Sequence, residues 1–449
     1  MSTALIILAA GKGTRMNSDL PKVLHPIAHA SMLEHAMAAG RALDPERNVV
    51  VAGHEAELVR TAVAEIDETA QVVLQEEQLG TGHAVQQARE ALQGFVGDVV
   101  VLYGDTPFVS QDTLERMVSA RSRADLVILG FEAADPARYG RLVMDGDSLE
   151  KIVEYKDATD AERAITFCNS GLMACDADVM FRLLDKVGND NASGEYYLTD
   201  LVELARDEGL AVTAVSCPED ETLGVNSRND LATADAVFQS RARAELLDLG
   251  VTLMAPETVY LAFDTIVGRD TVIEPNVVFG PGVTVESGAL IRAFSHLEGC
   301  HVSRGAKVGP YARLRPGAEL AEDTHVGNFV EIKNAEIAAG AKVNHLSYIG
   351  DASVGEATNI GAGTITCNYD GVMKHRTEIG ARAFIGSNTC PVAPVKVGSD
   401  AMTATGTVIT KNVEDGDLAI ARAVQTNKPG RARKLMDMLR AKKAAKVKG

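Results

Sequence analysis

The 449-residue sequence contains no tryptophan, and only 4% of its residues are aromatic. A core with so little aromatic volume has to be built from Val, Ile, Leu and Ala, which suits narrow, repetitive packing. The first apolar run, ALIILAA, is too short to span a bilayer and has no basic segment before it. We therefore expect a buried strand here instead of a signal peptide, and no membrane partner.

Regular cysteine spacing is also missing. The six cysteines (Cys168, Cys175, Cys217, Cys300, Cys367 and Cys390) form no CxxC pair, so we expect free thiols and a cytoplasmic location. The net charge is −18; from Lys428 onward nine Lys or Arg face one Asp, a local +8, which leaves −26 elsewhere. An acidic body disfavours nucleic acid as a partner. The basic tail, 426–449, is either an anion-binding segment or a solvated terminus.

Short apolar runs alternate with helix-like segments in the first half of the chain. ALIILAA, NVVVAG, AQVVLQ, DVVVLYGD and ADLVILGFE are continuous runs rich in Val, Ile and Leu, which is typical of strands buried on both faces. Segments such as SMLEHAMAAGRAL and DTLERMVSARSRA separate them. The alternation predicts a mostly parallel, Rossmann-like α/β domain over residues 1–228. The stretch 229–249 has no Gly or Pro, which predicts a long helix joining this domain to the next.

The second half has a six-residue period. Large apolar residues recur at this spacing with three slips of one residue, at Val267, Ile273, Phe279, Val285, Ile291, Leu297, Val302, Val308, Leu314, Leu320, Val326, Ile332, Ile337, Val343, Ile349, Val354 and Ile360. Hexapeptide repetition predicts a parallel β-helix over 250–425, with three hexads per turn and these side chains inside. The repeat is interrupted at Thr366–Glu378 and resumes at Ile379 and Ile385. We expect this insertion to loop out on the surface, where such loops serve function or assembly.

A glycine-rich loop, LAAGKGTRM (Leu8–Met16), follows the first predicted strand. Its spacing begins as GxG, but the third glycine of a dinucleotide-binding fingerprint is missing. A loop of this kind leaves backbone N–H groups free for phosphate oxygens, and Arg15 and Lys22 could neutralise a triphosphate. A plain glycine turn with surface cations is the alternative.

These motifs, with those that follow them, resemble a known family. LAAGKGTRM…LPK is similar to the signature of sugar-nucleotide pyrophosphorylases. QEEQLGTGHA, LYGDTP, RYGR, VEYKDAT, CNSGL, GEYYLTD and GVNSR follow in the order found in bacterial bifunctional N-acetylglucosamine-1-phosphate uridyltransferase/glucosamine-1-phosphate acetyltransferases. ARLRPGAEL, VGNFVEIK, HLSYIGD, NIGAGTITCNYDG and IGSNT resemble the second half of that family, a left-handed β-helix.

The resemblance implies roles for residues of the first domain. It places Mg²⁺ on Asp105 and Asn226; Asp105 ends a predicted strand, and Mg²⁺ prefers oxygen ligands. A helix-capping aspartate is the alternative for Asp105. The residues it assigns to UTP and the UDP-sugar are Leu8, Gly11, Gly13, Arg15, Lys22, Gln75, Gly80, Thr81, Tyr103, Gly140, Glu154, Asn169 and Asn226.

The β-helix carries a second set of candidates. Arg315 and Lys333 are 18 residues apart, one full turn, so they stack on one face. Like charges this close favour an anion between them, such as a sugar phosphate, although a solvated face is the alternative. His345 stands two places after the inward Val343, so its ring should point outward.

The resemblance makes His345 the base that deprotonates the glucosamine amine, a role suited to a neutral imidazole. It also implies sugar contacts at Tyr348 and Asn359. The acetyl-CoA contacts that it implies are Ala362, Asn368, Tyr369, Lys374, Ser387, Thr405 and Arg422. Thr405 departs from the small Ala that the resemblance predicts there, which would narrow or re-hydrate that pocket.

The predicted function is synthesis of UDP-N-acetylglucosamine for cell-envelope glycans. Acetyl-CoA would acetylate glucosamine 1-phosphate, and the N-acetylglucosamine 1-phosphate would attack UTP with release of pyrophosphate. The resemblance also implies a homotrimer. The alternative is a monofunctional nucleotidylyltransferase whose β-helix is structural or regulatory.

Overall fold

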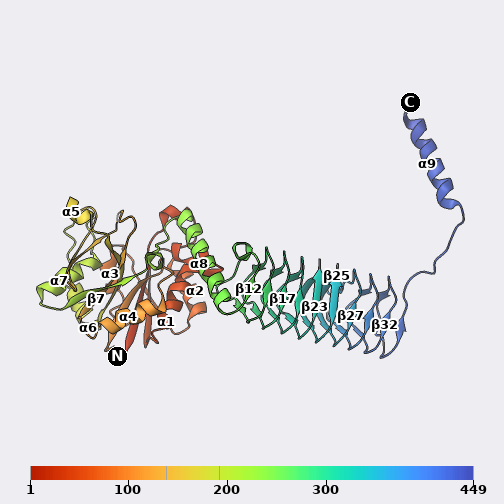
Figure 1. The fold of residues 1–449 in the computed structure, drawn as a ribbon, viewed down its shortest axis with the longest axis horizontal. Helices are drawn as coiled ribbons and strands as arrows, with labels where there is room; N and C mark the ends of the chain where they lie inside the picture. Colours follow the sequence, from red (N-terminus) through yellow and green to blue (C-terminus); the bar gives the residue numbers. More distant parts are fainter. Residues whose placement is uncertain (1, 138, 192, 448–449) are drawn as a thin grey trace. The chain divides into compact units, whose positions relative to one another are not determined.

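The computed structural model describes residues 2–137, 139–191 and 193–447 and divides into two compact units (Figure 1). The first unit is Met1–Glu245 with Leu261–Phe263, and the second is Leu246–Tyr260 with Asp264–Gly449. Arg138, the first residue of the RYGR motif, lies outside the described residues. All six cysteines are free, as their spacing predicts. In the described ranges, no helix is both long and apolar enough to cross a membrane.

The first unit is built around one mixed sheet with the order β11-β7-β10-β6-β1-β4-β5. All pairs on this path are parallel except those of β10, which is antiparallel to β6 and β7. The predicted mostly parallel sheet is therefore confirmed. The strands are β1 (Thr3–Ala9), β4 (Arg47–Ala52), β5 (Gln71–Leu74), β6 (Asp98–Tyr103), β7 (Leu126–Glu132), β10 (Phe167–Asp176) and β11 (Val212–Cys217).

Both faces of this sheet are buried. Along β4 and β6, Val49 and Val101 belong to one hydrophobic cluster and Val50 and Val100 to another, which is why these runs are continuously apolar. The covering helices include α1 and α4, whose first turns are capped by the hydroxyls of Ser31 and Ser110. The remaining elements are α1 (Met32–Arg41), α2 (Ala56–Ile66), α3 (Thr81–Gln86), α4 (Gln111–Ala120), α5 (Asp160–Arg163), α6 (Ala177–Leu184), α7 (Leu201–Asp207), β2 (Pro26–Ile27), β3 (Ala30–Ser31), β8 (Arg141–Asp145) and β9 (Ser148–Val153).

The predicted connecting helix is α8, Arg228–Asp248. It begins where the Asp230 carboxylate accepts the backbone N–H groups of Asn226 and Ser227, at 3.0 and 2.9 Å. This cap also fixes the turn that carries Asn226.

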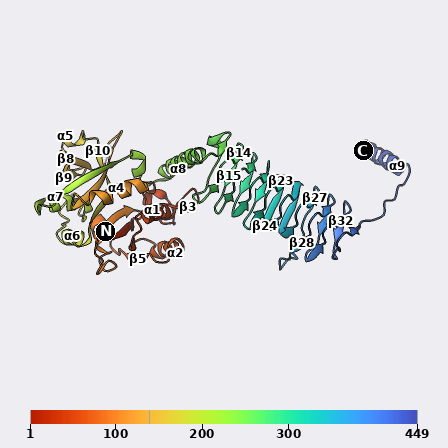
Figure 2. The ribbon, with the colours of Figure 1, turned by 60° about the horizontal axis from the view of Figure 1, so that its bottom comes forward.

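The second unit is a parallel β-helix whose stacked coils are clear in Figure 2. From β13 to β21, each strand pairs in parallel with the strand three further along the chain, such as β14 with β17 and β17 with β20, so a coil has three sides. Every predicted inward residue, from Val267 to Ile385, is at most 6% exposed, which confirms the hexad frame.

The β-helix strands fall into three groups. One sheet contains β12 (Thr252–Leu253), β14 (Val272–Ile273), β17 (Leu290–Ile291), β20 (Lys307–Val308), β23 (His325–Asn328), β25 (Lys342–His345), β27 (Asn359–Ile360), β29 (Phe384–Ile385), β32 (Met402–Thr403) and β34 (Leu418–Ala419). A second contains β13 (Ile266–Val267), β15 (Val278–Phe279), β16 (Thr284–Val285), β18 (His296–Leu297), β19 (Cys300–Val302), β21 (Arg313–Leu314), β22 (Ala318–Leu320), β24 (Glu331–Ile337), β26 (Tyr348–Val354), β28 (Thr377–Ile379) and β31 (Val395–Val397). β30 (Cys390–Pro391) pairs with β33 (Val408–Ile409).

The basic tail differs from expectation in one respect. A solvated terminus was one of the two expectations for it, whereas Arg431–Val447 form the helix α9. Its residues from Arg431 to Lys446 are exposed, and the run contains no Gly or Pro, so intrinsic helix propensity accounts for it.

Candidate active sites

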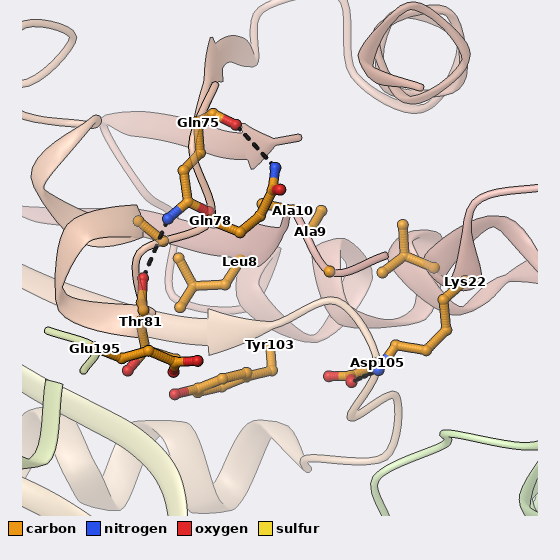
Figure 3. A pocket seen from close by; sticks show the side chains of 14 residues that line it. Leu8, Ala9, Ala10, Lys22, Gln75, Gln78, Thr81, Tyr103, Asp105 and Glu195 are labelled. Carbon is orange, nitrogen blue, oxygen red and sulfur yellow. Dashed lines mark hydrogen bonds and ion pairs between the residues drawn. The ribbon is translucent and has the colours of Figure 1, made fainter. Parts of the chain in front are cut away.

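A cavity of about 280 Å³ opens beside the carboxyl ends of β1 and β6 (Figure 3). Strand ends of a parallel sheet are where α/β folds bind ligands. The residues lining it are Leu8, Ala9, Ala10, Gly11, Lys22, Val23, Gln75, Gln78, Gly80, Thr81, Ala84, Tyr103, Asp105 and Glu195. Seven of the residues predicted from the sequence for the nucleotide, and the metal-ligand candidate Asp105, are thus brought together.

Asp105 and Asn226 converge on a single cation. The Lys22 ammonium group forms an ion pair with the Asp105 carboxylate and donates a hydrogen bond to Asn226 Oδ1 at 3.1 Å. The turn before Asn226 is held against Asp105, since the Val225 N–H donates to the Asp105 carbonyl at 3.0 Å. Asp105 and Asn226, which are 121 positions apart in the sequence, therefore each direct a side-chain oxygen at the Lys22 ammonium group.

The glycine-rich loop packs closely on Lys22. Gly13 has φ +57°, and a Cβ there would lie 2.6 Å from Lys22 Cβ, so only glycine fits. Arg15 is not drawn into the cavity: it lies exposed on a short 3₁₀ turn, Thr14–Met16. Of the two cations predicted to hold phosphate, Lys22 therefore lines the cavity and Arg15 does not.

Gln75 forms the opposite wall and is only 3% exposed. The side-chain Nε2 of Gln75 donates to the Gly80 carbonyl at 3.1 Å. The backbone carbonyl of Gln75 accepts from Gln78 Nε2 at 3.3 Å. Gly80 has φ +117°, and a Cβ there would lie 2.5 Å from the Tyr196 carbonyl oxygen. The LGTGHA segment is therefore a fixed polar wall able to read a base edge.

A second cavity of about 530 Å³ adjoins the first and shares Thr81, Tyr103 and Glu195 with it. It is also lined by Glu154 and Asn169. Gly140 belongs to the same corner, because its carbonyl accepts the Asn169 N–H at 2.8 Å. The predicted sugar residues Tyr103, Gly140, Glu154 and Asn169 are thus neighbours.

The pKa values of two groups that line this cavity are raised above their ordinary values. Burial, with help from the Asp105 charge, raises the pKa of Tyr103. Burial is also the main cause that raises the pKa of Glu154, and Asp157 and Asp200 add to it. Such shifts gather at functional sites.

The sequence analysis did not name several residues of these cavities. Gln78, Glu195 and Tyr197 line them. Gly171 lies so close to the Tyr103 ring that a Cβ at Gly171 would be 2.9 Å from it. Glu195, Tyr197 and Gly171 lie inside the quoted motifs GEYYLTD and CNSGL, so motif membership could have found them.

On the β-helix, the predicted base and four acetyl-CoA candidates form one column. Each of the first four directly precedes a corner residue with positive φ in its own coil. These four are His345, Ala362, Ser387 and Thr405. Backbone N–H groups join the coils: Gly363 to the His345 carbonyl at 3.2 Å, Asn388 to that of Ala362 and Gly406 to that of Ser387, both at 2.8 Å. Arg422 Nη1 donates to the Thr405 carbonyl at 2.5 Å, which extends the column by one coil.

The His345 side chain is exposed, as its hexad position predicts. Its Nδ1 lies 2.8 Å from Asn328 Oδ1 on the neighbouring strand. Because an amide oxygen only accepts, this contact fits the neutral tautomer whose proton is on Nδ1 and whose Nε2 has a free lone pair.

A cationic cluster lies on the adjoining face. Arg315 and Lys333 are on neighbouring coils, with the Arg315 N–H bonded to the Ile332 carbonyl at 2.9 Å. Arg315 also forms an ion pair with Glu331 at 2.7 Å, so the cluster contains a carboxylate as well as the two predicted cations. The pKa of Lys333 is lowered, first by Lys374 and then by desolvation and Arg315. Lys374, assigned above to acetyl-CoA, thus lies beside the sugar-phosphate candidates.

The insertion is looped out only in part. Its tip is exposed, with Tyr369 60% exposed, but Asn368 is only 9% exposed. Asn368 Nδ2 donates to the Asp351 carboxylate and, at 3.4 Å, to the Tyr348 hydroxyl. The expectation of a fully surface loop is therefore wrong at its base, where these polar partners bury Asn368. Asn359 lies on β27, opposite Lys342.

Comparison with known proteins identifies the family. Residues 5–168 match the MobA-like NTP transferase domain, and residues 264–299 match the bacterial transferase hexapeptide with six repeats. The bifunctional protein GlmU of Ruegeria sp. (strain TM1040) is 88% identical over the full length of both chains. Those of Ruegeria pomeroyi and Roseobacter denitrificans are 77% and 66% identical, again over the full length of both chains.

The chain belongs to the GlmU family. It is therefore a bifunctional enzyme that acetylates glucosamine 1-phosphate from acetyl-CoA and transfers uridylyl from UTP to the product, making UDP-N-acetylglucosamine for peptidoglycan and other envelope glycans. The monofunctional alternative is not favoured, because the GlmU match covers the β-helix as fully as the first unit.

Proposed function

We propose that the two cavities of the first unit are the uridyltransferase site, with Asp105 and Asn226 as the ligands of Mg²⁺. The observation that carries this proposal is the convergence of their oxygens on the Lys22 ammonium group. A carboxylate and an amide oxygen already paired with one cation fit a divalent ion that prefers oxygen ligands. When bound, Mg²⁺ would neutralise part of the triphosphate charge.

The protein residues divide the remaining work. Lys22 would leave the two oxygens and hold a phosphate of UTP. Gln75, Gly80 and Thr81 would hold the uracil edge, while Gly140, Glu154 and Asn169 orient the sugar beside Tyr103. The sugar phosphate is itself an anion, so no protein nucleophile is needed, and catalysis consists of positioning and charge neutralisation. Leu8, Gly11 and Gly13 would shape the loop, and Arg15 would have to move to reach a phosphate.

For the β-helix we propose the acetyltransferase site. Arg315, Lys333 and Lys374 would hold the acceptor phosphate, with Tyr348, Asn359 and Asn368 around the sugar. Three cations close together favour anions among them. Glu331, which pairs with Arg315, and Asp351 balance two of the three charges, and the remaining positive charge favours the acceptor phosphate. The column from Ala362 to Arg422 would hold acetyl-CoA, with Tyr369 at its side and Thr405 in contact through its exposed side chain.

We propose the following domain bounds, oligomeric state and location for the chain. Residues 1–228 form the uridyltransferase, 229–249 the connecting helix, 250–425 the acetyltransferase and 426–449 the basic tail. The hexapeptide family suggests a homotrimer, and the substrates and free thiols suit the cytoplasm. Sedimentation of the full chain at any mass other than three chains would overturn the trimer.

Metal dependence tests the uridyltransferase assignment. Asp105→Ala should abolish uridylyl transfer at all Mg²⁺ concentrations, and Asn226→Ala should raise the concentration needed for half-maximal rate. Both should weaken Mn²⁺ binding measured by electron paramagnetic resonance, and both should still release thiol from acetyl-CoA. Asp112→Ala, which removes an exposed ion pair with Arg116, is the matched control. Unchanged Mn²⁺ binding in Asp105→Ala would exclude this carboxylate as a ligand.

A further inference from the structure

We propose that Asn328 positions His345 for acetyl transfer by fixing the imidazole tautomer whose Nε2 is unprotonated. The inference rests on the proposed role of His345 as the base and adds a residue that acts through it.

The geometry around this pair is set by the β-helix itself. Asn328 ends β23 and His345 ends β25, and the two residues are direct partners in the parallel ladder. Their side chains meet at 2.8 Å, from Asn328 Oδ1 to His345 Nδ1. The backbone on both sides is held as well: the Leu346 N–H donates to the Asn328 carbonyl at 3.1 Å, and the Ser347 hydroxyl donates to the His345 carbonyl at 2.8 Å.

This arrangement decides which ring nitrogen can accept a proton. Asn328 Oδ1 has no hydrogen to give, so the shared proton is on His345 Nδ1. The lone pair is then on Nε2. Without the acceptor, the neutral ring would be free to exchange tautomers and to rotate, and part of the population would present an N–H to the amine.

An amide suits this role better than a carboxylate. A negative charge 2.8 Å from Nδ1 would favour the imidazolium and raise its pKa, which would leave less free base at neutral pH. The two strands that carry the pair, and the residues next along the same sheet, do not supply such a charge. On β23 the only titratable side chain is His325, whose pKa is lowered mainly by burial and then by Arg292, Lys307, Lys342 and His345. β25 adds Lys342, and on the other side residues 359–363 carry no titratable side chain.

The step that Asn328 supports balances without another reactant. The amine nitrogen forms a bond to the thioester carbonyl carbon, and one of its protons passes to Nε2. The C–S bond breaks, coenzyme A leaves as the thiolate, and the imidazolium returns the proton to sulfur. Nδ1–H stays bonded to Asn328 throughout, where the bond also stabilises the transient cation.

The test compares Asn328→Ala with Asn328→Asp in acetyl transfer across pH. Asn328→Ala should lower kcat by about three- to tenfold at every pH, the factor one ordinary hydrogen bond is worth, with little change in KM for acetyl-CoA. Asn328→Asp keeps the acceptor but adds charge. The acidic limb of its kcat/KM profile should therefore move up by about one pH unit, and above that limb kcat should return to the wild-type value.

Two controls keep the outcomes distinct. Asn412→Ala removes another side-chain bond between coils, the one from the Lys396 N–H to Asn412 Oδ1 at 3.0 Å, and should leave both activities unchanged. Uridylyl transfer from N-acetylglucosamine 1-phosphate reports that the first unit is folded in every variant, and an unchanged Tm of the full chain reports the same for the β-helix.

Equal losses in Asn328→Ala and Asn328→Asp with an unmoved acidic limb would show a structural role only and overturn the inference. Wild-type profiles in both variants would do so too. If His345→Ala retained acetyl transfer, the base assignment itself would fail, and the inference with it; an inactive His345→Ala beside an unaffected Asn328→Ala would overturn the inference alone.

Discussion

At the scale of single residues, Gly171 shapes the wall of the proposed sugar cavity. Its φ is +93°, and a Cβ there would lie 2.9 Å from the Tyr103 ring. The backbone conformation disfavours other residues, and the contact displaces the ring.

Gly171→Ala should therefore raise KM for N-acetylglucosamine 1-phosphate about tenfold, the effect of losing about 1.4 kcal/mol of binding. Gly146→Ala is the matched control, since Gly146 has φ +60° but nothing within 4 Å of its Cβ position. Steady-state kinetics on both variants separate the Tyr103 contact from backbone strain; equal kinetic effects would mean that the contact is unimportant.

Glu154 carries a stability cost that depends on pH. Burial raises its pKa in the folded state, with further contributions from Asp157 and Asp200. The folded state therefore holds this proton more tightly than the unfolded state, and the stability from it is complete below the unfolded pKa and lost as pH rises through the folded one. At pH 7.5 the ionised group opposes folding.

Glu154→Gln should consequently raise Tm at pH 7.5, by about 2–4 °C for each kcal/mol recovered, and the gain should vanish near pH 4. KM for the sugar phosphate should rise, because the proposed contact is altered. Calorimetry at the two pH values checks the sign. Glu57→Gln, at an exposed carboxylate, should change neither; a lower Tm at pH 7.5 in Glu154→Gln would contradict the account.

At the scale of elements, the tip of the insertion is folded around Asp370. Its carboxylate pairs with His375 at 2.7 Å and accepts the backbone N–H groups of Val372 and Met373. These contacts hold its pKa well below the usual range, with His375 the first cause. Lys374 lies between these anchored residues, so the turn places its ammonium group beside Lys333.

Asp370→Ala should loosen this turn and raise KM for glucosamine 1-phosphate several-fold while uridylyl transfer is unchanged. Asp400→Ala, which removes an exposed pair with Arg382, serves as control. Kinetics of both half-reactions make the comparison, and an unaffected acetyl transfer in Asp370→Ala would separate the turn from the acceptor site.

The sequence predicts elements well wherever one period dominates. The hexads place Val343 inside the β-helix, where it is buried. His345 ends its strand directly before Leu346, whose φ is +51°, so the chain turns a corner there and the His345 side chain is exposed. The buried base of the insertion was not predicted, since it depends on Asp351 and Tyr348, one coil away. The pairing of Asn328 with His345 was not predicted for a similar reason. A cross-strand contact follows from coil length, and the slip between Ile332 and Ile337 shortens this coil to 17 residues, from Asn328 to His345.

At the scale of the whole molecule, the family match covers the full chain, and the two proposed sets of site residues are suited to two different reactions. The residues proposed for uridylyl transfer lie in the first unit, and those proposed for acetyl transfer lie in the second. If the sites are separate, loss of one should leave the other intact, and the intermediate should be able to pass through solution.

The most direct measurement mixes Asp105→Ala with His345→Ala in the presence of glucosamine 1-phosphate, acetyl-CoA, UTP and Mg²⁺. Alone, Asp105→Ala should accumulate N-acetylglucosamine 1-phosphate, and His345→Ala should lose most acetyl transfer, by about 10²–10⁴-fold, while still converting added N-acetylglucosamine 1-phosphate. The mixture should restore UDP-N-acetylglucosamine, seen by chromatography of the products. A variant that loses both half-reactions while remaining folded, or a mixture that makes no nucleotide sugar although each retains its half-reaction, would contradict the account.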